Sequence, residues 1–307
     1  MILLLLVLLS LIVLVKSADV FVDQASSLAK KLNVNDFLVG FTVVAFGTSL
    51  PELVSTVFSS IDGHNQLVMS NIIGSNIANL CLIFGLIATF NIYRIHKRDV
   101  EVNIPLNLAA MMVFWAFSVW SGFKIDWPFG ISLILIFLVL ILLSKDYNHF
   151  SSNSDKKYAS LKPWLLLTSL ILLVGSGKFC IDGVIALAKQ LNIAETILGY
   201  FLLAIGTSLP ELVTTWVAVK KKDGELGMGN ILGSNLFNLL FILGISSFIH
   251  PVVITGFVTD LLFLTTATLA VYFFAVSGKK YTFSKRECVG LLLVYLLFVL
   301  FQIIRIS

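Results

Sequence analysis

Residues 45–54 read A-F-G-T-S-L-P-E-L-V and residues 204–213 read A-I-G-T-S-L-P-E-L-V, so nine of ten positions are identical. A second pair of segments, 67–85 and 226–244, shares eleven of nineteen residues at the same offset of 159. Leu-rich segments can resemble one another by chance, but identical Gly, Pro, Glu, Asn and Ser in one fixed register are not expected from composition alone. The chain therefore contains two copies of one structural unit.

The first apolar run, residues 2–15, belongs to this repeat. Asp23 matches Asp182, and Asn33 matches Asn192, with no insertion. No positively charged segment precedes the run and no convincing cleavage site follows it, as a signal peptide would require. We therefore expect the run to begin a membrane-spanning helix.

The composition is that of a membrane protein. The chain has 307 residues, of which 58% are hydrophobic and 12% charged, and its mean hydropathy is +0.99, outside the range of soluble domains. Apolar runs of roughly 18 or more residues recur, each long enough to cross a hydrocarbon core about 30 Å thick as a helix. We predict an all-α membrane protein with ten transmembrane helices. The predicted spans are about 1–30, 36–60, 66–92, 103–121, 127–144, 162–188, 195–219, 226–249, 256–277 and 287–305.

The most polar break, residues 145–161, separates five predicted helices from five. It divides the chain into a first repeat, 1–144, a linker loop and a second repeat, 162–307. Because five is odd, the second repeat crosses the membrane with the opposite polarity, which gives two inverted-topology five-helix repeats. With the N-terminus outside, sixteen Lys and Arg residues fall in inside loops and three outside. The positive-inside rule therefore predicts that both termini lie outside and the linker loop in the cytoplasm.

Several other classes of function are disfavoured. The net charge of +4 does not indicate nucleic-acid binding, because the basic residues occur in short clusters between apolar runs. An enzyme is disfavoured because no nucleophile with a base, no paired histidines and no phosphate loop occur, so we expect no cofactor. A channel is a further alternative, but an inverted repeat with one compact charged site favours exchange. No obligate protein partner is evident, and the lipid bilayer is the expected surrounding.

The repeated motif lies in the middle of the second and seventh spans. Its proline has no N–H group, so a carbonyl one turn earlier loses its helical partner, and we expect each helix to break there. Thr48 and Glu52 are four residues apart, as are Thr207 and Glu211. This spacing places a hydroxyl and a carboxylate on one face of each broken helix.

The third and eighth spans carry N-I-I-G-S-N-I-A-N (71–79) and N-I-L-G-S-N-L-F-N (230–238). Gly74 and Gly233 are small enough to let a neighbouring backbone approach. The first asparagine of each stretch lies about one turn from the expected site, and its role is ambiguous. The other polar residues could be interhelical hydrogen-bonding groups or could line a site. A polar stripe at four-residue spacing is formed in each helix by Ser75 with Asn79 and by Ser234 with Asn238.

Two interpretations of the S-L-P-E stretch compete. In a capping box, Ser49 or Ser208 caps a half-helix and the glutamate reaches back, and part of that geometry is expected. A neutral glutamine would cap as well, however, whereas an ionisable residue at membrane depth costs at least about 2.5 kcal/mol. No Lys or Arg lies at that depth in these spans to neutralise Glu52 and Glu211. A bound cation is the expected counter-charge, and oxygen donors suit Na⁺ and Ca²⁺.

Charged residues also occur within the first and sixth spans. Lys16 with Asp19, and Lys178 with Asp182, have helical spacing for ion pairs near a membrane face. We expect these pairs to form, and assign no transport role to Asp23 or Asp182.

The two G-T-S-L-P-E helices, each followed by a G-S-N-x-x-N helix, resemble the repeats of the cation/Ca²⁺ exchanger superfamily, in particular its prokaryotic Na⁺/Ca²⁺ exchangers. The resemblance covers the whole chain. It implies a core of eight packed helices, with two long tilted helices, the first and sixth, that slide across the core to alternate access. It also implies an integral protein of the prokaryotic cytoplasmic membrane.

The resemblance implies a set of ion ligands by position. One position departs from part of the superfamily, because some relatives, including K⁺-dependent ones, have aspartate where this chain has Asn238. Two carboxylates offer a charge of −2, which balances one Ca²⁺ and argues modestly against K⁺ co-transport. The implied ligands are Glu52, Glu211, Thr48, Thr207, Ser49, Ser208, the carbonyls of Ala45 and Ala204, Ser75, Ser234, Asn79 and the departing Asn238.

These observations predict a secondary active antiporter that exchanges Na⁺ for Ca²⁺ by alternating access at a central two-glutamate site. One alternative is a Ca²⁺/H⁺ antiporter, in which the same glutamates take protons. Another is a K⁺-dependent Na⁺/Ca²⁺ exchanger.

Overall fold

The structure, a computed structural model, describes residues 2–90, 93–94, 96–147, 160–190, 206–277 and 282–306. The helices of the first half are α1 (Ile2–Leu32), α2 (Asp36–Val39), α3 (Ala45–Thr48), α4 (Leu50–Ile61), α5 (Asn65–Ile77), α6 (Phe84–Phe90), α7 (Ile104–Trp120) and α8 (Trp127–Tyr147). The helices of the second half are α9 (Pro163–Gln190), α11 (Leu209–Lys220), α12 (Gly224–Leu236), α13 (Leu243–Ile249), α14 (Val258–Ser277) and α15 (Lys285–Ile306).

Short irregular turns join several of these helices. The turns η2 and η4 occupy matching positions of the repeat, are both π-helical and contain Asn79 and Asn238 respectively. Such wide turns within α-helices occur frequently at functional sites. The five turns are η1 (Gly40–Val44), η2 (Ala78–Ile83), η3 (Asp99–Asn103), η4 (Phe237–Ile242) and the 3₁₀ turn η5 (Thr255–Phe257).

Among the described residues, eight helices are long and apolar enough to span a membrane, and a ninth span is obtained when Asp36–Thr48 and Leu50–Ile61 are taken together. The axes of this pair are bent by 48°, which confirms the break predicted from the proline in the motif. The predicted span 195–219 is described only from residue 206. The predicted helical membrane fold is confirmed, and the count of ten helices stays a prediction.

Two short strand pairs show how matching helices are oriented. β1 (Tyr93–Arg94) pairs antiparallel with β4 (Thr282–Phe283), and β2 (Lys124–Ile125) pairs antiparallel with β3 (Val252–Val253). β1 and β2 flank α7, whereas β3 and β4 flank α14. The strand before α7 therefore lies beside the strand after α14, and the two helices run antiparallel. Because α7 and α14 are matching elements, this is the relation that an inverted repeat requires.

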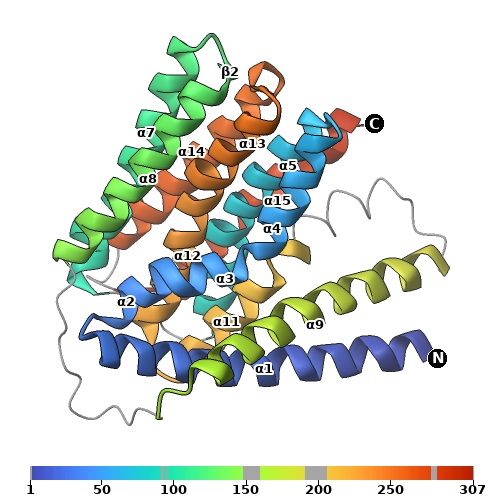
Figure 1. Cartoon of the computed structure of the whole chain (residues 1–307), viewed down its shortest axis with the longest axis vertical. Helices are drawn as coiled ribbons and strands as arrows, with labels where there is room; N and C mark the ends of the chain where they lie inside the picture. The colour runs from blue at the N-terminus through green and yellow to red at the C-terminus, as the bar shows by residue number, and fades with distance from the viewer. Residues whose placement is uncertain are drawn as a thin grey trace.

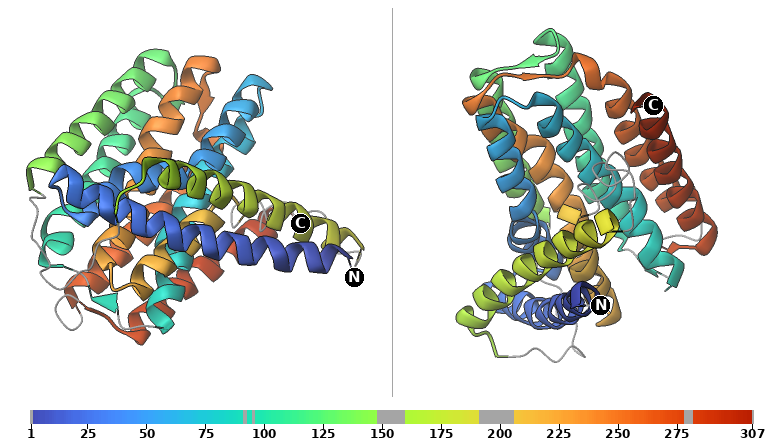
Figure 2. Two further views of the ribbon diagram at one scale, coloured as in Figure 1. Left: turned by 60° about the horizontal axis from the view of Figure 1, so that its bottom comes forward. Right: turned by 90° about the vertical axis from the view of Figure 1, so that its right-hand side faces the viewer.

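Helices α1 and α9 lie side by side and cross the other helices obliquely, as Figure 1 and Figure 2 show. They share a buried cluster with neighbouring elements, which includes Leu14, Phe21, Leu173 and Val217. A second, larger hydrophobic cluster lies among the remaining helices. This division agrees with the expectation that the first and sixth helices pack separately from a core.

Helix α12 approaches η1 backbone to backbone. A Cβ atom added at Gly233 would lie 2.7 Å from Phe41 Cα, and one added at Gly229 would lie 2.7 Å from Phe41 N. A Cβ atom at Gly40 would lie 3.1 Å from Asn230 N. Residues without a side chain are therefore needed at this crossing, which confirms the close approach predicted for Gly233.

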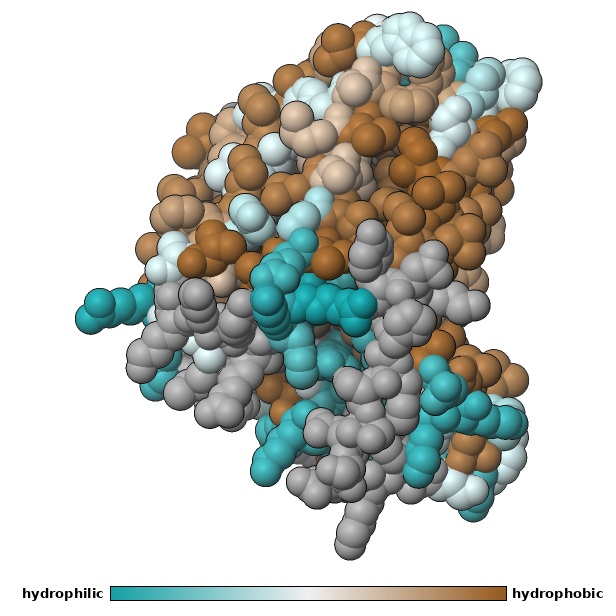
Figure 3. Space-filling model, turned by 90° about the vertical axis from the view of Figure 1, so that its left-hand side faces the viewer, coloured by the Kyte–Doolittle hydropathy of each residue, from teal (hydrophilic) through white to brown (hydrophobic). Residues whose placement is uncertain are grey.

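The outer surface of the described helices is largely apolar. Figure 3 shows hydrophobic side chains over the broad upper part of one face and hydrophilic side chains gathered toward its lower part. Large apolar side chains such as Trp120, Leu142 and Phe179 are exposed. Helices with apolar side chains on their outer surfaces are typical of proteins surrounded by lipid.

We expect Gly233→Ala to lower the free energy of unfolding by about 1–3 kcal/mol, because the added methyl group overpacks against the backbone at Phe41. Gly175→Ala in α9 is the matched control, since no atom lies within 4 Å of a Cβ atom there. Alanine is also the better helix former. Thermal unfolding of the purified proteins measures the difference. Equal stability of the two variants would contradict the close crossing of α12 and η1.

Candidate ion-binding site

The two copies of the motif adopt the same local backbone. Ser49 lies between α3 and α4 with φ −84° and ψ 12°, and Ser208 precedes α11 with φ −87° and ψ 7°. In both copies the proline is in the first turn of the following helix and the glutamate lies in the same turn. The N-terminal end of a helix favours a negative charge. Identical sequence has therefore produced two matching half-helix ends, each with a carboxylate.

The motif serines do not form the predicted capping box. Neither Ser49 nor Ser208 makes a side-chain cap bond to its own helix. Instead, Ser49 Oγ donates to Glu211 Oε1 at 2.7 Å, and Ser208 Oγ donates to Glu52 Oε1 at 3.3 Å. Each serine thus donates to the glutamate of the other half. The cap positions of the serines are confirmed, but the predicted side-chain cap bonds are not formed, because the hydroxyls are used across the two halves.

Both glutamates are fully buried. Glu52 Oε2 and Glu211 Oε2 have no hydrogen-bond partner among the described residues. The ion pairs of the described part of the chain involve other acids, and no Lys, Arg or His contacts either glutamate there. Two buried carboxylates therefore lie without a protein counter-charge, which is costly unless a cation binds.

The motif threonines contact asparagines of the opposite half. Thr48 Oγ1 donates to Asn230 Oδ1 at 3.1 Å, and Thr207 Oγ1 donates to Asn71 Oδ1 at 3.5 Å. The amide group of Asn71 donates to the Glu52 carbonyl at 3.3 Å. The amide group of Asn230 donates to the Glu211 carbonyl at 3.4 Å. The ambiguous first asparagine of each G-S-N helix is therefore a bridge between the halves.

The serines of the G-S-N helices lie beside the same groups. Ser234 Oγ donates to Glu211 Oε1 at 3.5 Å. Ser75 Oγ and Thr207 Oγ1 are 3.4 Å apart, and either can donate. Both serines are fully buried. The structure thus joins eight of the predicted ligand residues to one another or to the bridging asparagines: Thr48, Ser49, Glu52, Ser75, Thr207, Ser208, Glu211 and Ser234.

The remaining predicted ligands differ in their surroundings. Asn238 Nδ2 donates to Asn76 Oδ1 at 3.1 Å. Neither amide atom of Asn79 has a partner among the described residues, although the residue is fully buried. The Ala45 carbonyl accepts from Ser49 N at 3.0 Å and from Thr48 Oγ1 at 3.4 Å. Ala204 lies outside the described residues.

The donors gathered here are carboxylate, hydroxyl and amide oxygens. Such hard donors suit Na⁺ and Ca²⁺ rather than transition metals. Within the described part of the chain, no group of three or more His, Cys, Asp or Glu side chains could hold a metal ion. A site with two carboxylates and several neutral oxygens is therefore the candidate that the geometry provides.

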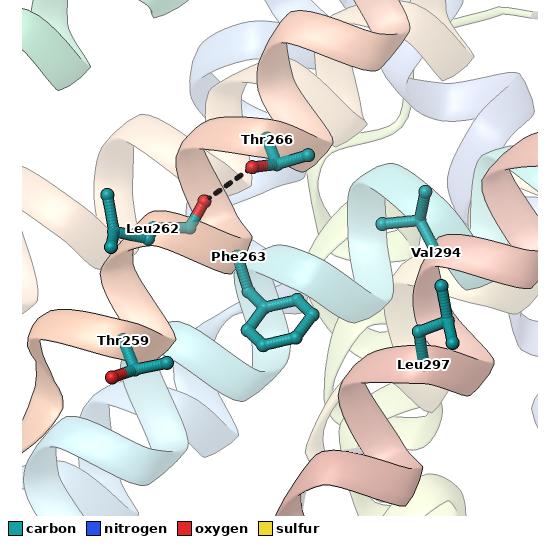
Figure 4. Close-up of a pocket in the computed structure, with 6 residues that line it drawn as sticks. All are labelled: Thr259, Leu262, Phe263, Thr266, Val294 and Leu297. Atoms are coloured by element: carbon teal, nitrogen blue, oxygen red, sulfur yellow. Dashed lines mark hydrogen bonds between the residues drawn. The ribbon is translucent and has the colours of Figure 1, made fainter.

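A hollow between α14 and α15, of about 210 Å³, does not extend this site. Thr266 Oγ1 donates to the Leu262 carbonyl of its own helix at 2.8 Å, and the lining carries no charge. The hollow is therefore an apolar groove between helices. Figure 4 shows the side chains around it: Thr259, Leu262, Phe263, Thr266, Val294 and Leu297.

Long apolar helices, one of them broken beside buried carboxylates, define an integral membrane transporter of cations. A family model described as "Sodium/calcium exchanger protein" matches residues 2–145 and 161–304. The chain belongs to the sodium/calcium exchanger family, and the resemblance inferred from the motifs is confirmed. Members of this family are cation/Ca²⁺ antiporters, which is consistent with a chain that is not an enzyme.

Individual relatives cover most of the chain. The sodium/calcium exchanger MaX1 of Methanosarcina acetivorans is 31% identical over an alignment of 312 positions that covers 87% of this chain and 88% of MaX1. The inner membrane protein YrbG of Escherichia coli is 31% identical over 80% of this chain and 79% of its own length. The solved structure of the sodium-calcium exchanger NCX_Mj soaked with Na⁺ and Sr²⁺ has a TM-score of 0.83 and 27% identity, with 95% of both chains covered.

We expect Ser49→Ala to lower the free energy of unfolding by about 1.5–3 kcal/mol, the usual contribution of a hydrogen bond to a charged group. Ser60→Ala in α4, the helix that follows Ser49, is the matched control, because its hydroxyl donates to the Thr56 carbonyl one turn earlier. The control is expected to lose about 1 kcal/mol or less. Unfolding is measured without Na⁺ or Ca²⁺. Equal losses would contradict a strong bond between Ser49 and Glu211.

Proposed function

We propose that the chain exchanges Na⁺ for Ca²⁺ across the membrane by alternating access at Glu52 and Glu211. One observation carries the proposal. Each glutamate accepts a hydrogen bond from a serine of the opposite half, and each has a second oxygen that is buried without a partner in the described part of the chain. These two oxygens provide negative charge between the halves, where a transported cation is the natural counter-ion.

Charge supports the choice of ions. Two carboxylates carry −2 when ionised, which one Ca²⁺ neutralises, whereas several Na⁺ would leave an excess of positive charge. Ca²⁺ takes six to eight oxygen ligands, and the serine, threonine and asparagine oxygens near the glutamates add to the carboxylates. Na⁺ and Ca²⁺ then compete for overlapping ligands, so that one ion displaces the other. That relatives are named sodium/calcium exchangers agrees with this pair of ions.

The proposed arrangement places two inverted repeats, 1–144 and 162–307, on either side of the loop 145–161. Ten spans follow from the apolar runs, and both termini outside and a cytoplasmic loop follow from the distribution of Lys and Arg. The similarity to an Escherichia coli inner membrane protein supports a location in a prokaryotic cytoplasmic membrane. The antiparallel relation of α7 and α14 supports the inverted topology.

The second candidate is Ca²⁺/H⁺ exchange. Its support is that a buried carboxylate oxygen without a partner can take a proton as well as a metal ion. Ca²⁺ uptake into proteoliposomes separates the two candidates when a Na⁺ gradient is imposed at clamped pH, or a pH gradient without Na⁺. Uptake driven by Na⁺ alone supports the proposal, and uptake driven by the pH gradient alone overturns it. The same assay with and without K⁺ tests for K⁺ dependence.

We expect Glu52→Gln and Glu211→Gln each to abolish Ca²⁺ uptake driven by a Na⁺ gradient, because an amide keeps the shape of the side chain but not its charge. Glu101→Gln is the control, since this carboxylate is largely exposed and pairs with Lys97. Uptake is measured in proteoliposomes with matched amounts of folded protein. Retained uptake in either variant would remove that glutamate from the proposed site.

A further inference from the structure

Three asparagines form a directed chain of hydrogen bonds between the halves. Asn76 Nδ2 donates to the main-chain carbonyl of Asn235 at 3.0 Å, and Asn238 Nδ2 donates to Asn76 Oδ1 at 3.1 Å. All three side chains are buried. Asn76 is not among the ligands predicted from the sequence, and its contacts give it a different task.

The chemistry of the groups fixes the direction of this chain. A main-chain carbonyl can only accept, so Asn76 must face Asn235 with its NH₂ group. The oxygen of Asn76 then faces Asn238, which must contribute its own NH₂ group. What remains is Asn238 Oδ1, which is buried and has no hydrogen-bond partner in the described part of the chain.

We propose that Asn76 is a positioning residue that makes Asn238 present its oxygen, and not its NH₂ group, to the transported cation. The inference rests on the proposed exchange function. A neutral amide can bind Na⁺ or Ca²⁺ only through oxygen, so its orientation decides whether it attracts or repels the ion. Asn76 fixes that orientation without touching the ion.

The corresponding hydrogen bond of the other half, from Asn79 Nδ2 to Asn235 Oδ1, is not formed among the described residues. Asn79 corresponds to Asn238 in the repeat, and Asn235 corresponds to Asn76. Both amide atoms of Asn79 and the Oδ1 atom of Asn235 have no partner among the described residues. The positioning bond is therefore present for one of the two matching asparagines in this conformation.

A double-mutant cycle tests the assignment. We expect Asn76→Ala to raise the apparent KM for Ca²⁺ about three- to tenfold, because the hydrogen bond that orients Asn238 is lost. The maximal rate of exchange should change little. In an Asn238→Ala background, the same substitution should raise KM no further, because Asn76 acts through Asn238. Asn107→Ala is the control, since that buried amide bonds its own helix at the Asn103 carbonyl.

Equal increases of KM in both backgrounds would overturn the assignment and make Asn76 a structural bridge. If Asn76→Ala does not fold, Asn76→Ser, which cannot reach Asn238, is measured in the same way. The Ca²⁺ concentration that half-stabilises the purified protein against heat gives a second value without transport. A wild type with no Na⁺-driven Ca²⁺ uptake would overturn the proposed function, whereas normal uptake with an unchanged KM in Asn76→Ala would overturn only the positioning role.

A second inference comes from an ion-pair cluster far from these asparagines in sequence. Lys221 Nζ lies 3.0 Å from Asp19 Oδ1 and 2.7 Å from Asp23 Oδ1. It also donates to the Asp19 carbonyl at 2.7 Å, and Ser26 Oγ donates to Asp223 Oδ2 at 2.7 Å. The predicted pairing of Asp19 with the lysine one turn earlier is wrong. Helix α1 is instead tied to the loop between α11 and α12.

The repeat places the same pair in the other half with its charges reversed. At the offset of 159, Asp19 matches Lys178 and Lys221 matches Asp62. In that half, helix α9 carries the basic residue, Lys178, and the loop after α4 carries the acidic residue, Asp62. Lys178 and Asp62 are exposed, and neither forms an ion pair within the described residues. The predicted pair of Lys178 with Asp182 is therefore wrong as well.

Packing shows the same difference between the halves. Helix α1 packs along α11, whereas α9 makes no comparable contact with α4 in the described part of the chain. A groove of about 670 Å³ lies between α1 and α9, and Asp182 and Gly183 are among its lining residues. Lys178 does not line this groove, but its side chain is exposed.

We infer that two sets of ion pairs, here called latches, form in alternation. Lys221 pairs with Asp19 and Asp23 in the conformation described, and Lys178 pairs with Asp62 in the conformation of opposite access. An inverted repeat allows each half to take up the arrangement of the other. The reversed charges of Asp19 and Lys178, and of Lys221 and Asp62, keep both of these pairs attractive, whereas Asp182, which matches Asp23, adds a like charge beside Asp62. In the proposed orientation, the closed latch lies at the cytoplasmic face. This inference also rests on the proposed function.

Substitutions that reverse the two charges test the second latch, Lys178 with Asp62. We expect Asp62→Lys and Lys178→Asp each to lower the maximal rate of Na⁺/Ca²⁺ exchange several-fold, because like charges then oppose closure. The double variant restores the attraction and should recover most of the wild-type rate. A double variant no faster than either single variant would overturn the latch.

Cross-linking tests the same pair without transport. Asp62→Cys and Lys178→Cys are introduced together in a protein whose Cys81, Cys180 and Cys288 are replaced by serine. We expect a short thiol cross-linker to join the two positions in membranes, and to do so more in a Lys221→Ala background, where the observed latch is broken. No cross-link in either background would overturn the inference, even if the wild type exchanges Na⁺ for Ca²⁺.

Discussion

Glu52 and Glu211 are two carboxylates buried completely among uncharged side chains, and no basic side chain of the described residues pairs with them. Ionised groups in such surroundings are expensive without a partner. The broken helices reduce that cost in part, because each glutamate lies in the first turn of α4 or α11, where the helix end favours negative charge. Under the proposed function, the transported cation supplies the positive charge that the protein does not.

The hydrogen bonds around the glutamates connect the two halves rather than closing within each half. Ser49 and Ser208 each donate a hydrogen bond to the glutamate of the opposite half, and Asn71 and Asn230 each accept one from the threonine of the opposite half. An ion bound at the carboxylates therefore contacts groups that belong to both repeats. Under the proposed function, this is how occupancy of one site affects the relative position of the halves, and loss of the ion leaves two buried carboxylates without a counter-charge.

The sequence predicts those features that depend on local chemistry. The fixed offset identifies Glu52 with Glu211, the proline predicts the 48° break, and Gly233 predicts a close helix crossing. It does not predict contacts between segments distant in the chain. Ser49 was compatible with a local cap, and only its place beside Glu211 shows its use. Asp19 has a lysine one turn away, yet it pairs with Lys221, because the packing of α1 against α11 decides which charges meet.

The central claim is that Na⁺ and Ca²⁺ compete for one site at the two glutamates. Equilibrium binding of radioactive Ca²⁺ to the purified protein, with Na⁺ or choline added at equal ionic strength, tests it most directly. The account predicts saturable binding of Ca²⁺ that Na⁺ displaces and choline does not, and that disappears when Glu52 and Glu211 are both replaced by glutamine. Ca²⁺ binding that persists in the double variant, or that Na⁺ leaves unchanged, would contradict it.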